Sequence, residues 1–79
     1  MNLSHLAKEA DRLRNDEIFH KALNDIRAEA LDALATANAD DKTMIVRLQQ
    51  KVAVIDEIRT TLDRYILAAE VQEPAGSFA

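Results

Sequence analysis

Glu17 and His20 are the two residues whose types and spacing best match a site for chemistry. They lie in the run EIFH, and a Glu-x-x-His spacing places a carboxylate and an imidazole on one helical face, as in di-iron helical bundles. Such a centre needs further inward-facing carboxylates and a second copy of the motif. Asp56 and Glu57 are the only acids in the middle of the C-terminal apolar pattern, and they lie off its stripe. We therefore predict no metal site, with Glu17 at a helix N-terminus and His20 at the surface.

The other groups that could act in catalysis are scattered. His5 and Glu9 are four residues apart, a spacing that permits a surface hydrogen bond or ion pair. Ser4 and Ser77 lie near the two chain ends, where a catalytic geometry is hardest to hold. The sequence has no cysteine and only one glycine, Gly76, so thiolate sites and glycine-rich phosphate loops are excluded. We predict a protein that is not an enzyme and uses no cofactor.

Three acidic residues, Asp25, Glu29 and Asp32, fall on one face of a predicted helix. Such a face can imitate phosphates for a basic groove, which would make the protein a small acidic inhibitor or regulator of a nucleic-acid-binding partner. The alternative is a solvated helix face, since the nearby Lys21 and Arg27 dilute the negative field. The formal net charge is −4 and no segment forms a basic stripe, so direct binding to nucleic acid is not expected.

Helix formers dominate the chain, and no glycine or proline occurs before Pro74. Everything up to about residue 71 can therefore be helical, with interruptions only where Asn and Asp cluster, at 14–17 and 38–42. The first predicted helix is short, is capped by Asn2 or Ser4, and carries one apolar face. That face comprises Leu3, Leu6, Ala10 and Leu13.

Two longer helices are predicted over about 16–37 and 41–71, each with an apolar stripe at alternating spacings of three and four residues. The first stripe comprises Phe19, Leu23, Ile26, Ala30, Leu34 and Ala37. The second comprises Ile45, Leu48, Val52, Ile55, Ile58, Leu62, Ile66 and Ala69. Asn38 in the left-handed conformation would end one helix, and Asp40 or Asp41 would cap the next. Because this connection is short, the two helices should form an antiparallel hairpin.

The second hairpin helix should extend past the first. Roughly 30 residues at about 1.5 Å each span about 45 Å, against about 33 Å for its partner. Its end therefore lacks a partner within the hairpin. The residues of this end are Tyr65, Ile66, Leu67 and Val71. We expect the N-terminal helix to cover this end if the chain turns back at 14–16, and a second protein to cover it otherwise.

The sequence thus predicts an all-α fold, an antiparallel helical hairpin with a short N-terminal helix, completed either as a three-helix bundle or as an oligomeric bundle. Met44, Val46, Val54 and Leu67 lie off the main stripe, so one neighbouring helix cannot bury the whole apolar surface. We predict one helical domain, 1–72, and a flexible C-terminal tail, 73–79, where proline bars continuation of the helix.

The uncovered end and the tail supply the predicted protein interface. Its residues are Tyr65, Leu67, Val71 and Phe78. Tyr65 combines an apolar ring with a polar tip, which suits interfaces, and equally suits the rim of a core. A protein partner or a second copy of the chain is the expected occupant. Phe78 either remains disordered or reaches back to the end of the long helix.

Length and composition restrict the remaining possibilities. A domain of 79 residues buries only about 60% of its unfolded surface, so help from a partner is reasonable. Aromatic residues make up 4% of a chain that is 48% hydrophobic, which favours close helix packing over a large ligand pocket. Charges near the N-terminus exclude a signal peptide, and no apolar run reaches membrane-spanning length. We expect a soluble protein of the cytoplasm.

Residues 14–66 contain three short motifs in order. They follow patterns in which LL-x-D-x-x-F-x-x-A-L leads into a helix, T-x-x-x-D forms a turn, and L-x-x-x-V-x-x-I-D-x-I-R-x-x-L lies on a second helix; the chain matches the first pattern from its aspartate onward. The matching residues are Asp16, Phe19, Ala22, Leu23, Thr36, Asp40, Leu48, Val52, Ile55, Asp56, Ile58, Arg59 and Leu62. This order resembles small helical proteins encoded in the packaging and head gene modules of tailed bacteriophages. The resemblance implies an accessory role in virion assembly or DNA packaging, in the host cytoplasm or on the virion, and brings no catalytic residues with it.

Overall fold

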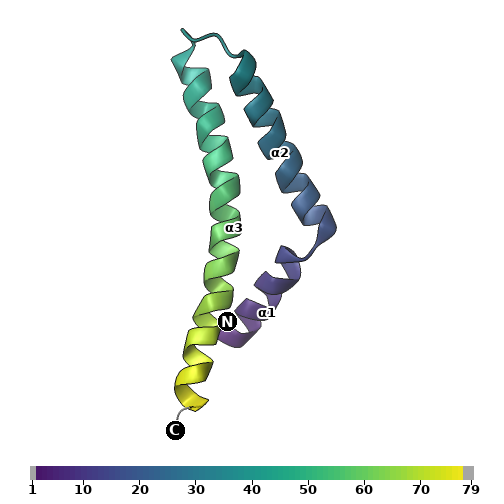
Figure 1. The fold of residues 1–79 in the computed structure, drawn as a ribbon, viewed down its shortest axis with the longest axis vertical. Helices are drawn as coiled ribbons and strands as arrows, with labels where there is room; N and C mark the ends of the chain where they lie inside the picture. Colours follow the sequence, from purple (N-terminus) through teal and green to yellow (C-terminus); the bar gives the residue numbers. More distant parts are fainter. Residues whose placement is uncertain (1, 78–79) are drawn as a thin grey trace.

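The protein folds as a long helix with two shorter helices laid end to end against it (Figure 1). The computed structural model describes residues 2–77, and the side chains of residues 2–70. Within that range the helices are α1 (Leu3–Arg14), α2 (Glu17–Thr36) and α3 (Lys42–Ser77). Both α1 and α2 run antiparallel to α3. The predicted all-α hairpin with a short N-terminal helix is confirmed.

Each helix begins at a side-chain cap. Asn2, Asp16 and Asp41 each accept a hydrogen bond through a side-chain oxygen from the backbone N–H three residues later, at 2.7, 2.8 and 3.1 Å. A cap of this kind satisfies one of the N–H groups that have no partner within the helix. Local side-chain chemistry therefore sets where the helices start in a chain with almost no glycine or proline.

The turn between α2 and α3 differs from the expectation in one respect. No described residue has a positive φ, so the prediction of a left-handed Asn38 is wrong. The preceding Ala37 takes extended angles, φ −66° and ψ 143°, and leads the chain out of α2 without a left-handed residue. The Asn38 side chain instead accepts a hydrogen bond from the backbone N–H of Asp40 at 2.9 Å. A side-chain turn replaces the expected helix cap.

The placement of α1 also corrects the expectation. The chain bends at residues 15–16 but does not turn back, and α1 still lies against the far end of α3. The reason is length: α1 and α2 have 12 and 20 residues, against 36 in α3. Because α1 precedes α2, continuing in the same direction carries it onto the part of α3 that α2 does not reach. A chain that turned back would instead place α1 beside α2.

The end of α3 lies beyond the position expected from the sequence. The helix runs through Pro74 to Ser77, whereas the sequence placed its end near residue 71. Proline fixes φ close to the helical value, and its cost is one lost hydrogen bond and a clash with the carbonyl four residues earlier. A helix can therefore continue across it. The predicted packing of Phe78 lies outside the described residues, as does the side chain of Val71.

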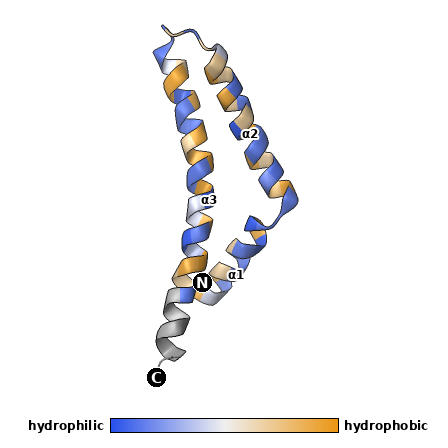
Figure 2. Ribbon diagram, viewed as in Figure 1, coloured by the Kyte–Doolittle hydropathy of each residue, from blue (hydrophilic) through white to orange (hydrophobic). Residues whose placement is uncertain are grey.

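The hydrophobic core is a single thin layer between α3 and the two shorter helices. Figure 2 shows apolar residues interspersed with polar ones along all three helices. The buried apolar residues of the described part are Ala10, Leu23, Ala30, Ile55, Leu62 and Ala69. Three of these six are alanines, so the helices approach closely at small side chains. The molecule measures 60 × 24 × 19 Å, a shape that leaves a large share of its surface exposed.

Because α2 and α3 pack closely at Ala30, a larger side chain at this position should destabilise the fold. Ala30 is 2% exposed, so Ala30→Leu should push α2 away from α3 and lower the free energy of unfolding by about 1–3 kcal/mol. Ala35→Leu is the control, because Ala35 lies on the same helix and is exposed. Urea denaturation at one fixed protein concentration measures both. Equal stability of the two variants would show that α2 does not pack at Ala30.

Candidate functional site: the two flanks of the hairpin

One flank of the hairpin is held together by polar side chains. Arg27 of α2 donates from Nε to Asp56 Oδ1 of α3 at 2.9 Å. Close by, Arg59 donates from Nη2 to Asn24 Oδ1 at 2.5 Å. The hydrogen bond from Arg27 and the charge of Asp56 raise the pKa of the Arg27 guanidinium above its ordinary value. These contacts define what we call the polar flank.

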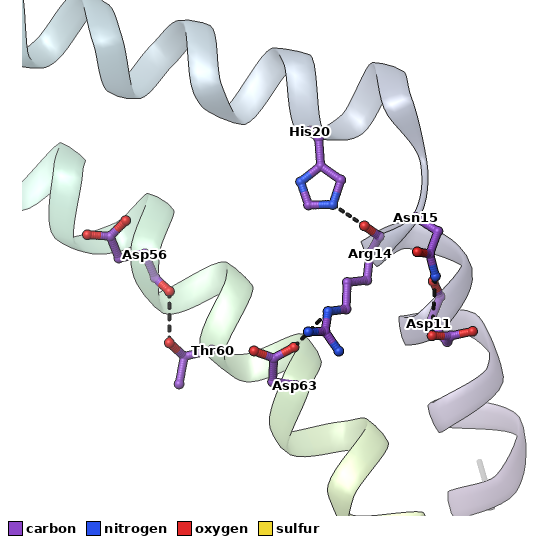
Figure 3. A network of polar contacts seen from close by, with 7 residues as sticks. All are labelled: Asp11, Arg14, Asn15, His20, Asp56, Thr60 and Asp63. Atoms are coloured by element: carbon purple, nitrogen blue, oxygen red, sulfur yellow. Dashed lines mark hydrogen bonds and ion pairs between the residues drawn. The ribbon is translucent and has the colours of Figure 1, made fainter.

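The polar flank continues across the bend between α1 and α2 (Figure 3). Arg14 Nε lies 3.1 Å from Asp63 Oδ1 of α3. That oxygen is shielded from solvent and accepts no hydrogen bond among the described residues, so the charge of Arg14 is what compensates its burial. The His20 ring donates from Nε2 to the carbonyl of Arg14, and Asn15 donates to the carbonyl of Asp11 at 2.8 Å. The bend is thus fixed to both helices that it joins.

The opposite flank is apolar and open. At about 100° per residue, Val54, Ile58 and Tyr65 lie on the side of α3 away from Asp56, with the core residues between. A groove of about 330 Å³ opens here, and its walls come from one stretch of α3. They are Val54, Glu57, Ile58, Thr61 and Leu62. Ile26 of α2 faces the same side and is also exposed. We call this side the open flank.

A second hollow continues the open flank toward the end of α3. It encloses about 110 Å³ between α1 and α3. Its lining is Leu6, Glu9, Ala10, Leu13, Leu62 and Tyr65. Leu62 lines both hollows, so they form one apolar path along α3. Glu9 lies at its edge, where Arg12 holds the pKa of that carboxyl below its ordinary value through a hydrogen bond and its charge.

A second seam on α3 explains the open flank. Its residues follow the same alternation of four and three as the core stripe, displaced by about a quarter turn. They are Val54, Ile58, Thr61, Tyr65 and Ala68, and we call them the open seam. Val54 is 52% exposed and Tyr65 36%. From the sequence, Val54 was placed off the main stripe, but the open seam was not predicted. The spacing of the open seam nevertheless forms a second heptad pattern.

The structure separates the predicted interface residues. Tyr65 lies on the open seam beside α1, whereas Leu67, 58% exposed, lies on the outer side of α3 and lines neither hollow. The side chain of Val71, and Phe78, fall outside the described residues. Of the two predicted interface residues whose side chains the structure describes, Tyr65 lies in the candidate surface, where it joins Val54 and Ile58.

The acidic face of α2 is solvated. Asp25, Glu29 and Asp32 are all exposed and share the side of α2 away from α3. Lys21 donates to Asp25 at 2.8 Å and so offsets part of the negative charge of this face, as the sequence predicted. Arg27 instead points to α3, where it contacts Asp56. The face therefore carries three carboxylates and one paired lysine.

The Glu17 and His20 pair takes local roles. Glu17 is exposed in the first turn of α2, while His20 contacts the Arg14 carbonyl. Among the described residues, no group of three or more His, Asp or Glu side chains is placed to hold a metal ion. In the same part of the chain, no helix has both the length and the apolar character that a membrane crossing requires.

Comparison of the chain with protein-family models, curated proteins and solved structures found no match. The resemblance to bacteriophage packaging and head proteins therefore stays a prediction. What the site itself offers is an asymmetric surface, polar and tied on one flank, apolar and open on the other.

The Arg14 contact predicts local control of α1. Arg14→Gln should speed amide hydrogen exchange in α1 by up to about fivefold, because exposed ion pairs contribute up to about 1 kcal/mol. Arg12→Gln is the matched control, since Arg12 pairs only within α1, with Glu9. Hydrogen exchange read by mass spectrometry resolves α1 from α2. The same exchange rates in both variants would mean that apolar contacts alone hold α1 on α3.

Proposed function

We propose that this protein is a non-enzymatic contact module that binds another protein chain along its open flank. The observation that carries the proposal is the open seam, a mostly apolar line of side chains on the longest helix. Val54 and Tyr65 are exposed, and the residues between and beyond them are half-buried. Grooves of this kind suit helix recognition, because side chains spaced by three and four residues can insert between those of the seam.

The lining of the groove supports contact over catalysis. Of its five residues, Glu57 alone carries a charge, and Thr61 adds a hydroxyl. An active site combines an acid or base with further polar groups that orient the substrate and stabilise developing charge. The walls around Glu57 are aliphatic side chains, which favour packing against another apolar surface.

The setting that we propose is the assembly of a virion or the packaging of its DNA in a tailed bacteriophage. This part rests on the motif order in residues 14–66 alone. A slender module that acts by contact is compatible with an accessory role of this kind, in the host cytoplasm or on the virion.

The acidic face provides a second candidate function, as an inhibitor of a nucleic-acid-binding protein. The observation in its favour is the position of Arg27, which points to Asp56 and away from Asp25, Glu29 and Asp32. A basic partner would then meet three carboxylates and a single lysine. Binding through this face should weaken steeply with added salt.

Site-specific photocrosslinking in the native host tests these surfaces against each other. A photoreactive phenylalanine analogue replaces Val54 on the open seam, Asp32 on the acidic face, or Leu67. Leu67 is the control, since it is 58% exposed and lies on the side of α3 away from both the open seam and the acidic face of α2. We expect protein adducts at position 54 well above those at 67 and 32, with mass spectrometry identifying each adduct.

The pattern of adducts decides between the two functions. Adducts concentrated at position 32 would replace the contact module with the acidic inhibitor. Equal yields at all three positions would contradict both. An adduct with a head or packaging protein at position 54 would support the proposed setting, and adducts exclusively with unrelated proteins would remove it.

A further inference from the structure

We propose that the open seam binds the open seam of a second copy of this chain, with the two α3 helices antiparallel and related by a two-fold axis near residue 60. The inference rests on the proposed function, because it names the occupant of the same surface. In this dimer each α3 would pack against its own α1 and α2 along the core stripe, and against the partner copy along the open seam, about a quarter turn away.

The spacing of the open seam fits a helix of its own kind. Val54, Ile58, Thr61 and Tyr65 alternate by four and three residues, the pattern that lets side chains of two helices interlock. An axis near residue 60 places Ile58 opposite Thr61 of the other copy, and Val54 opposite Tyr65. A large residue then meets a smaller one at each level, which is the arrangement that fills space.

Charges at the rim of the seam favour the antiparallel direction. Glu57 and Arg64 are one heptad apart on the same edge of the open seam, and both are exposed. In an antiparallel pair the same edges face each other, so Glu57 of each copy lies near Arg64 of the other. Neither residue makes an ion pair among the described side chains. Two reciprocal ion pairs would therefore form without breaking an existing one.

The parallel direction would bring like charges together. Arg47 and Lys51 continue the spacing of the open seam toward the start of α3. In a parallel dimer each would meet its own counterpart, and like charges directly opposed are unfavourable. With the antiparallel axis near residue 60, Lys51 lies opposite Ala68 of the other copy. The charge pattern therefore selects one direction.

The slender shape of the monomer leaves much of its surface in contact with solvent. The chain exposes 6049 Å², whereas a compact folded monomer of 8.8 kDa is expected to expose about 4,800 Å². A chain that buries so little surface on its own gains stability when a partner covers more of it. Pairing along α3 would remove apolar side chains from water where the monomer buries few.

Sedimentation equilibrium with a matched pair of variants tests the dimer. The unmodified chain should sediment at twice 8.8 kDa at micromolar concentration. Val54→Glu should sediment as a monomer, because it places a charge in the seam. Val46→Glu should remain dimeric, since Val46 is 48% exposed on the same helix but lies off the seam. Circular dichroism of each variant checks that the helices are intact.

A charge exchange tests the direction. Glu57→Arg and Arg64→Glu should each raise the dimer dissociation constant about tenfold, a factor equal to about 1.4 kcal/mol. The double variant should restore it, and a mixture of the two single variants should form heterodimers in preference to either homodimer.

Each negative result has a defined meaning. A helical chain that stays monomeric at every concentration overturns the dimer, yet leaves the proposed function standing if position 54 still crosslinks to a different protein. A dimer that Val54→Glu leaves intact places the interface elsewhere. A dimer insensitive to both charge changes overturns the antiparallel arrangement.

Discussion

Burial of one apolar stripe on a helix longer than either of its neighbours is the constraint on which the rest of the structure depends. At 36 residues, α3 needs α1 and α2 in series to cover its stripe. The bend at residues 15–16 follows from this need, because two helices that each pack on α3 need not be collinear with each other. The caps at Asp16 and Asn2 fix where those covering helices begin. Since both lie on one side of α3, its other apolar seam is left exposed.

The two flanks of the hairpin have different roles: the polar flank aligns the helices, and the open flank exposes apolar side chains. On the polar flank, three contacts between arginines and their partners set the register of α1 and α2 along α3. These side chains are exposed or half-buried, so each contact contributes modestly to stability and more to specifying one alignment. The open flank has no such ties among the described residues and presents Val54, Ile58 and Tyr65. A surface left apolar beside a thin core is typical of a chain that acquires part of its stability by association.

Much of the fold was predictable from the sequence, because the stripes on α2 and α3 and the Asn and Asp clusters are local signals. The prediction that α1 must turn back to reach the end of α3 was wrong. The direction of α1 depends on the path of the chain after the bend, and no residue type specifies that path. The predicted end of α3 was wrong because proline was assumed to end the helix, whereas the helix continues through Pro74. Within the site, Tyr65 was predicted and the open seam was missed. Its Thr61 and Ala68 are weakly apolar, and only the position of α1 and α2 shows that the seam remains uncovered.

The proposed dimer pairs the two open seams in antiparallel fashion. The chain has no cysteine, so Gln50→Cys allows a single spin label at an exposed position of α3. Double electron–electron resonance then measures the distance between the two labels of a dimer. An axis near residue 60 predicts about 30 Å, because the labelled sites are separated by roughly 20 residues along the helix direction. Strong dipolar broadening of the continuous-wave spectrum, as labels about 10 Å apart on parallel helices would give, or no intermolecular signal at all, would contradict the antiparallel dimer.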